Sequence, residues 1–192
     1  MGKAKQLLPY HGESLLGHAA RTASESLCHP VLVVLGANAT QLRRELRDAE
    51  VYSTVNEFWP EGIGSSIRFG VATLEQLARI EALVIMLCDQ PLVEANVIDR
   101  LVRTYLRTRV PVVASKYEKD HDLVVGAPAL FGRALFPELL NLRGNQGARQ
   151  VVARHRRETV VVEVPEAVFD VDTPRDYEML QNGTEQQILP VH

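Results

Sequence analysis

Two short segments are apolar along almost their whole length, and they constrain the fold more than any other feature of the sequence. "VLVVLG" covers residues 31–36 and "ALVIMLCD" covers residues 82–89. A strand without a polar face must be buried on both sides, which is typical of a parallel sheet covered by helices. Segments with helical spacing alternate with these strands, as in the run that contains Ile67, Val71 and Leu74. The pattern predicts a three-layer α/β fold with a mostly parallel sheet and helices on both faces.

The remaining elements indicate one domain. Further strands are expected at residues 51–55, 110–115, 124–131, 159–164 and 167–172. A last helix begins in "TPRDYEML", with Thr173 as its N-cap and Pro174 at its first position. We expect a single domain over residues 1–181, followed by a polar tail over residues 182–192.

The composition argues against several classes of partner. The net charge of the 192 residues is -3, so we expect neither nucleic acid nor a membrane surface to be bound by bulk charge. No apolar run approaches the roughly 20 residues of a membrane span, and we expect a cytoplasmic protein. Cys28 and Cys88 form no C-x-x-C pair, and the histidines lack zinc-binding spacing, so no zinc site is expected.

Acidic residues follow two of the predicted strands. Asp89 ends the apolar run "VIMLCD", and Asp172 lies in "VFDVDTP", two residues after Asp170. Ligands bind at the carboxyl ends of the strands in such sheets, and Mg²⁺ prefers one or two carboxylates together with phosphate and water oxygens. The alternative is that each aspartate only caps the following helix. Period-two alternation places Asp170 and Asp172 on one side of their strand, so either could be the ligand; we expect Asp172, which lies beside the helix start.

Three loops have the composition of anion sites. Lys3 and Lys5 lie in the opening loop, where a lysine supplies charge for a triphosphate, although a solvated lysine is the alternative. "WPEGIGSSIR" combines glycines with a predicted helix start, where backbone N–H groups favour an anion; an ordinary capped turn is equally consistent with it. "GNQGAR" has the same pattern, with Arg149 in the first helical turn.

The ordered series of motifs resembles a known family. "MGKAKQLLPYHG", "NEFWPEGIGSSIRFG", "LCDQP", "GAPALF", "GNQGAR" and "FDVDTPRDY" are similar to segments of the MobA-like nucleotidyltransferases, in particular the branch that contains molybdenum cofactor cytidylyltransferase. The resemblance implies a Rossmann-like nucleotidyltransferase fold and transfer of CMP from CTP to molybdopterin, with release of pyrophosphate. It also implies Mg²⁺ as cofactor, a catalytic role for Lys5 at the phosphates, and Asp89 and Asp172 as catalytic metal ligands.

The resemblance extends to the binding loops. It implies that the nucleotide is framed by Gly62, Gly64, Ser65 and Ser66, together with Lys5. On the acceptor side it implies the residues Gly126, Pro128, Gly144 and Arg149. Two positions depart from the family pattern: Ala127 replaces a histidine of "G-H-P", and Asn145 replaces an aspartate of "G-D-x-G-A-R". The loss of that carboxylate leaves a different acceptor open.

The family's first strand and its loop, of the form L-A-A-G-x-S-x-R, are expected immediately before Met1 and are absent from this sequence. Either the true start lies upstream, which we favour, or the short chain is genuine and binds nucleotide poorly. The missing loop holds residues that distinguish cytosine from guanine, so GTP stays open as donor. Two other functions also stay open: transfer to another phosphorylated acceptor such as a sugar phosphate, and a non-catalytic maturation factor that carries molybdopterin to a client molybdoenzyme.

Overall fold

A computed structural model describes residues 4–119 and 121–182. Lys3 of the opening loop and residues 183–192 of the predicted polar tail lie outside the described residues. Within the described part, no helix is both long enough and apolar enough to cross a membrane.

The described strands form a small hairpin, a two-stranded parallel pair and a four-stranded sheet. Their bounds are β1 (Pro9–Tyr10), β2 (Glu13–Ser14), β3 (Leu32–Leu35), β4 (Tyr52–Val55), β5 (Ala82–Ile85), β6 (Val112–Lys119), β7 (Asp122–Gly132) and β8 (Thr159–Glu163). β3 and β4 pair in parallel, and the larger sheet has the order β5-β7-β6-β8. β7 runs antiparallel to both neighbours, whereas β6 and β8 are parallel. β5, β6 and β8 therefore share one direction and β7 opposes them, so the larger sheet is mixed rather than mostly parallel, within the predicted α/β class.

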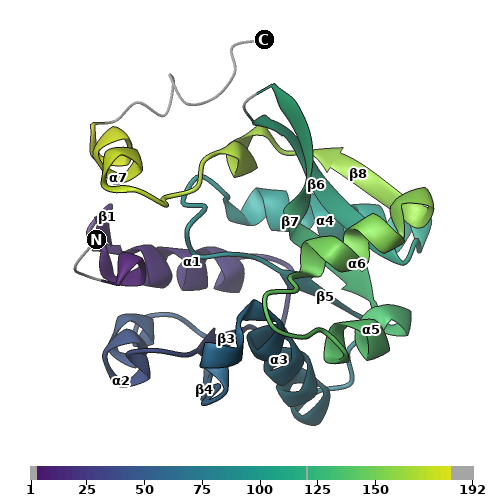
Figure 1. The fold of residues 1–192 in the computed structure, drawn as a ribbon, viewed down its shortest axis with the longest axis horizontal. Helices are drawn as coiled ribbons and strands as arrows, with labels where there is room; N and C mark the ends of the chain where they lie inside the picture. The colour runs from purple at the N-terminus through teal and green to yellow at the C-terminus, as the bar shows by residue number, and fades with distance from the viewer. Residues whose placement is uncertain (1–3, 120, 183–192) are drawn as a thin grey trace.

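Helices cover both faces of the larger sheet (Figure 1). The α-helices are α1 (Leu15–Ser24), α2 (Ala39–Leu42), α3 (Ile63–Leu77), α4 (Ala95–Thr108), α5 (Phe136–Leu140), α6 (Ala148–Arg154) and α7 (Pro174–Gln181). The 3-10 helices are η1 (Lys5–Leu7), η2 (Arg43–Leu46), η3 (Trp59–Glu61), η4 (Arg133–Leu135), η5 (Arg156–Glu158) and η6 (Pro165–Val168). Phe131 packs in a core cluster with residues of α3, α5 and α6, while its neighbour Leu130 packs with Leu101 of α4. The alternation along β7 thus fills both cores of a three-layer α/β fold, as predicted.

The sheet is divided between β3 and β5. Within the described residues, no ladder joins the β3–β4 pair to the larger sheet. Leu35 and Leu83 are buried, but Val33 and Ile85 are only half-buried, so the prediction of full burial on both faces is wrong for these two strands. Side-chain packing bridges the division, because Cys88 lies against the cluster of α1, β3 and η2 residues that contains Leu35.

The predicted strand at residues 167–172 is wrong. Pro165 opens the 3-10 helix η6, and the segment after it pairs with none of the strands in the described part of the chain. Its Val171 N–H instead donates to the Asp89 carbonyl oxygen at 2.8 Å. The apolar alternation has another cause. Phe169 and Val171 are buried in a cluster with Tyr10 and with Leu15 of α1, so the pattern indicates a buried side rather than membership of the sheet.

The first and last described segments lie side by side in Figure 1, where β1 and α7 are neighbours. The Tyr177 hydroxyl donates to the Pro9 carbonyl oxygen at 2.8 Å, and Leu180 packs in the same cluster as Tyr10. The N-terminal hairpin continues into α1, whose N-cap Ser14 accepts a hydrogen bond from the Gly17 N–H. This docking brings η1 next to the segment that precedes α7.

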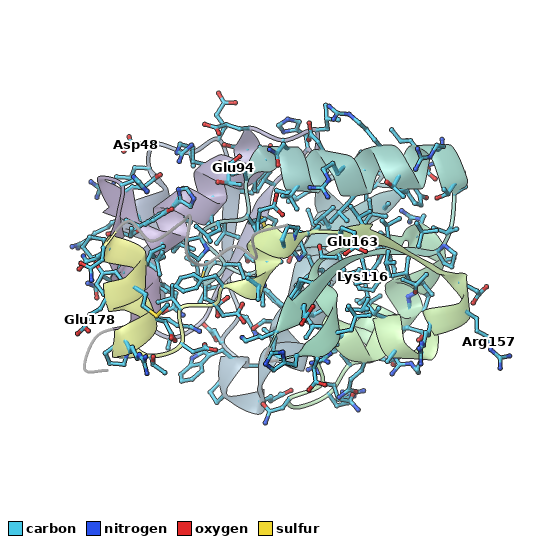
Figure 2. The ribbon with its side chains drawn as sticks, turned by 90° about the horizontal axis from the view of Figure 1, so that it is seen from above. Asp48, Glu94, Lys116, Arg157, Glu163 and Glu178 are labelled. Atoms are coloured by element: carbon cyan, nitrogen blue, oxygen red, sulfur yellow. The ribbon has the colours of Figure 1, made fainter. Side chains whose placement is uncertain are left out.

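Charged side chains lie mainly on the periphery (Figure 2). Lys116 of β6 and Glu163 of β8 are register partners that form an ion pair on the outside of the sheet. Glu178 of α7 points away from the body of the protein. Lys5, Asp89 and Asp172 differ from this pattern, because their charged groups meet in a partly buried cluster.

Candidate active site

Lys5 joins two carboxylates that are distant in sequence. Its Nζ lies 2.5 Å from Asp89 Oδ2 and 2.9 Å from Asp172 Oδ1. Lys5 comes from η1, Asp89 follows β5, and Asp172 precedes α7. The structure thus brings all three predicted catalytic residues into one cluster at the end of β5.

The two aspartates have no capping role. The N-cap of α4 is Glu94, and the N-cap of α7 is Thr173, which forms a reciprocal capping box with Asp176. Thr173 is the N-cap that the sequence predicts, and it leaves the carboxylate of Asp172 free to face Lys5. The alternative explanation for both acids is therefore wrong.

Asp170 and Asp172 point to different partners, contrary to the prediction that they share a side. Asp170 accepts a hydrogen bond from Lys119 Nζ of β6 at 2.7 Å, whereas Asp172 binds Lys5. The segment is irregular, so strand alternation does not apply to it. Lys119 neutralises Asp170, which selects Asp172 as the partner of Asp89. Lys119 carried no sequence signal of this role, since it lies in a polar hairpin.

Burial and hydrogen bonding act against each other at this cluster. Burial alone would lower the pKa of Lys5, but the hydrogen bonds to Asp89 and Asp172 outweigh it and raise the pKa above its usual value. Burial, with the charge of Asp89, raises the pKa of Cys88 to about 11. The ammonium therefore stays charged and the adjacent thiol stays protonated, so Cys88 is not a thiolate nucleophile at neutral pH.

The donor set fits a hard divalent cation. Asp89 Oδ1 is buried and has no hydrogen-bond partner among residues 4–119 and 121–182, which is costly unless another group compensates it. Asp172 has a side chain that is 62% exposed, so one side of the cluster is open to a ligand. The described residues contain no group of three or more His, Cys, Asp or Glu side chains placed to hold a metal. Two carboxylates completed by phosphate and water oxygens are the arrangement that Mg²⁺ accepts.

The predicted nucleotide loop, which carries Gly62 and Gly64, contacts the predicted acceptor loop, which carries Gly144 and Asn145. The Gly64 N–H donates to the Gly144 carbonyl oxygen at 2.9 Å. Gly62 has φ +110°, and a Cβ there would lie 2.5 Å from both Asn145 Oδ1 and the Gly144 oxygen. Arg68 of α3 adds a second link, since its Nη1 donates to the Leu142 carbonyl oxygen at 2.6 Å. Glycine at position 62 is therefore required by backbone conformation and by the close approach of the second loop.

Asn56 is a site-supporting residue that sequence patterns did not identify. Its side chain is almost fully buried and donates to the hydroxyl groups of Ser65 and Ser66 at 2.9 and 3.2 Å. Its Oδ1 accepts from the Phe58 N–H. The Ser65 hydroxyl is used within the loop, because it also lies within hydrogen-bonding distance of two carbonyl oxygens, those of Phe58 and Gly62. A polar residue directly after a strand was the available signal. The predicted nucleotide contacts of the two serines stay predictions.

The predicted acceptor residues lie in different surroundings. Pro128 is buried and its carbonyl oxygen accepts from the Ser115 hydroxyl at 2.6 Å, while a Cβ at Gly126 would meet nothing within 4 Å. Within the described residues, neither makes a hydrogen bond to the Lys5 cluster. Arg149 is exposed at the start of α6. Burial raises the pKa of Tyr117, and the positive charges of Lys119 and Arg149 act against this rise.

Comparisons with known proteins bear on this arrangement. The MobA-like NTP transferase domain family matches residues 1–160. Nicotine blue oxidoreductase of Paenarthrobacter nicotinovorans is 32% identical over 147 residues, which are 76% of this chain and 71% of the relative. Purine catabolism protein PucB of Bacillus subtilis is 28% identical, with 95% of this chain and 90% of PucB covered.

A solved structure shares the fold over almost the whole chain. Rv0371c from Mycobacterium tuberculosis H37Rv is 27% identical, with a TM-score of 0.76 and coverage of 95% of this chain and 91% of that chain. A second structure of Rv0371c, described as a complex with manganese, matches with a TM-score of 0.72, 27% identity and coverage of 95% and 94%.

Proposed function

The chain belongs to the MobA-like NTP transferase domain family, and from this premise we propose that it transfers CMP from CTP to molybdopterin and releases pyrophosphate. The cluster of Lys5, Asp89 and Asp172 is the proposed centre of this reaction, with Mg²⁺ as its cofactor. CTP and molybdopterin are the proposed substrates, and a molybdoenzyme that receives the product is the proposed client.

One observation carries the proposal: Lys5 links Asp89 and Asp172 across 84 and 167 positions of the chain, in a cluster that leaves Asp89 Oδ1 unpartnered. A purely structural ion pair needs no third charge and no orphaned oxygen. The manganese complex of the relative Rv0371c supports a divalent cation in this fold.

The residues have separate tasks in nucleotidyl transfer. Asp89 and Asp172 would hold Mg²⁺, which supplies charge stabilisation on the phosphate oxygens when bound. Lys5 neutralises negative charge on the triphosphate as the α-phosphorus is attacked in line and pyrophosphate leaves. An acceptor phosphate is already anionic, so the reaction needs no strong general base. The site accordingly does not require a histidine.

Asn145 sets the acceptor side apart from the family pattern. The loop that carries it contacts Gly62, and the replacement of a carboxylate by an amide removes one negative charge there. An acceptor with additional negative charge is therefore tolerated better at this position. A sugar phosphate is the alternative acceptor within the same reaction class.

An oxidoreductase activity is a second candidate, because the relative with 32% identity is named nicotine blue oxidoreductase. A charge cluster with an open carboxylate gives more support to phosphate chemistry.

The test is pyrophosphate release, measured with each nucleoside triphosphate in the presence and absence of molybdopterin. We expect release with CTP that depends on both molybdopterin and Mg²⁺. Asp89→Asn and Asp172→Asn should each reduce release about 100-fold or more. Glu178→Gln is the matched control, because it removes the same charge from an outward-pointing side chain of α7 and should leave release unchanged.

Three results would contradict the proposal. Equal pyrophosphate release by Asp89→Asn and the wild type would show that Asp89 is not a metal ligand needed for the reaction. Molybdopterin binding without release of pyrophosphate would indicate a carrier. Reduction of nicotine blue by a protein that releases no pyrophosphate would favour the oxidoreductase.

A further inference from the structure

The ammonium of Lys5 takes the place in which a cation is expected. It lies within 2.9 Å of an oxygen of each carboxylate, so the same position serves Lys5 and a metal shared by Asp89 and Asp172. The two cannot occupy it together. Which cation is present must therefore depend on what else is bound.

We propose that Lys5 is a placeholder cation, which holds Asp89 and Asp172 together without metal and moves to the triphosphate when a divalent ion takes its place. This inference rests on the proposed function, since it uses the same metal site. Metal and nucleotide then bind cooperatively, because each is needed to make the exchange favourable.

Lys5 is attached to the protein in a way that allows this movement. It is the first residue of η1, a helix of only three residues, none of which is buried. Its side chain is 29% exposed, and Asp172 beside it is 62% exposed. A lysine also has a flexible four-carbon stem and a compact charge, so it changes partners without backbone movement.

The ammonium satisfies the cluster only in part. It contacts Oδ2 of Asp89, whereas Oδ1 stays buried without a hydrogen-bond partner. A divalent ion and its water ligands offer more contacts than a single ammonium. The unsatisfied oxygen of Asp89 distinguishes a placeholder cation from a structural ion pair in which every buried oxygen has a hydrogen-bond partner.

Charge balance explains the coupling to nucleotide. With Lys5 in place the cluster keeps one net negative charge, since two carboxylates face one ammonium. A divalent ion that enters alone must displace the ammonium or lie beside it, and like charges repel. A triphosphate removes this conflict because it gives the ammonium a new anionic partner.

The inference is tested by the affinity for Mn²⁺ alone, read from the electron paramagnetic resonance signal of free Mn²⁺. Lys5→Met should bind Mn²⁺ at least about tenfold more tightly than the wild type in the absence of nucleotide, which corresponds to about 1.4 kcal/mol. Lys5→Arg keeps the charge and should stay close to the wild type. Lys116→Met is the matched control, because it removes an ammonium that pairs with Glu163 on the outside of the sheet.

Addition of a non-hydrolysable CTP analogue supplies the second reading. It should tighten Mn²⁺ binding more in the wild type than in Lys5→Met, because only the wild type has an ammonium to relocate. If Lys5→Met does not fold, as judged by circular dichroism, Lys5→Gln replaces it, since its amide keeps a hydrogen-bond donor toward Asp89.

The outcomes separate this inference from the proposed function. If the wild type and Lys5→Met bind Mn²⁺ equally, while an Asp89→Asn/Asp172→Asn variant loses binding, the placeholder role is wrong and the metal site stands. Weaker Mn²⁺ binding by Lys5→Met than by the wild type would also overturn the placeholder role. If none of the three proteins binds Mn²⁺, with or without the analogue, the metal site itself is wrong.

Discussion

Replacement of Gly62 by alanine tests the contact between the two loops. Gly62 has φ +110° and ψ 179°, a conformation almost confined to glycine, which costs other residues about 1–3 kcal/mol. The new Cβ would lie 2.5 Å from Asn145 Oδ1 and from the Gly144 oxygen, so one loop must move. Loss of the adjacent Gly64–Gly144 hydrogen bond adds about 0.5–1.5 kcal/mol. We therefore expect Gly62→Ala to lower the free energy of unfolding by about 1.5–4.5 kcal/mol.

The assay is equilibrium unfolding in urea, and Gly12→Ala is the control that separates strain from contact. Gly12 also has positive φ, at +86°, but a Cβ there would meet nothing within 4 Å. Gly12→Ala should therefore lose only the conformational part, about 1–2 kcal/mol. For a domain of this size 1 kcal/mol shifts the melting temperature by roughly 2–4 °C, so the difference is measurable. Equal losses in the two variants would refute the inferred contact between the loops.

Three further predictions concern stability. Asn56→Ala should cost about 1–3 kcal/mol in urea unfolding, because it leaves the buried Ser65 hydroxyl without a donor; a loss under 0.5 kcal/mol, on the order of a surface substitution, would contradict this role. Phe131→Ala, at a fully buried side chain, should cost about 3–5 kcal/mol, and a marginal change would contradict its central place in the core. Hydrogen bonding to Glu138 raises the pKa of His155 despite the opposing effect of burial, so its stabilisation is complete below about pH 6.5 and is lost as pH rises through the raised value. His155→Gln should therefore lose about 0.5–1 kcal/mol at pH ~5.5 and almost nothing at pH ~9, and a loss independent of pH would show that the ion pair is not its source.

The fold was largely predictable because apolar patterning reports burial. The continuous runs at residues 31–36 and 82–89 contain strands, and Thr173 caps the last helix as predicted. Residues 167–172 were assigned wrongly for a physical reason: alternation shows that one side is buried, but not whether the backbone pairs with a sheet. Phe169 and Val171 meet the N-terminal hairpin, a contact between distant segments that local patterns do not contain.

The candidate site was predictable in its charged members but not in its connections. Acids after apolar segments pointed to Asp89 and Asp172, although the segment before Asp172 is not a strand, and the family resemblance pointed to Lys5. The choice between Asp170 and Asp172 depended on Lys119, which lies 51 positions away along the chain. Asn56 escaped notice because a single buried amide has no periodic signature. Pairings of this kind are set by tertiary structure, and only coordinates reveal them.

The span of the Lys5 cluster has a consequence for how the protein matures in the cell. Asp172 lies 167 positions after Lys5, so a ribosome must translate nearly the entire domain before the Lys5 cluster can form. Nascent chains that already contain Lys5 and Asp89 would still lack the final carboxylate. The cluster, and with it the activity proposed for it, can therefore form only after translation has passed residue 172.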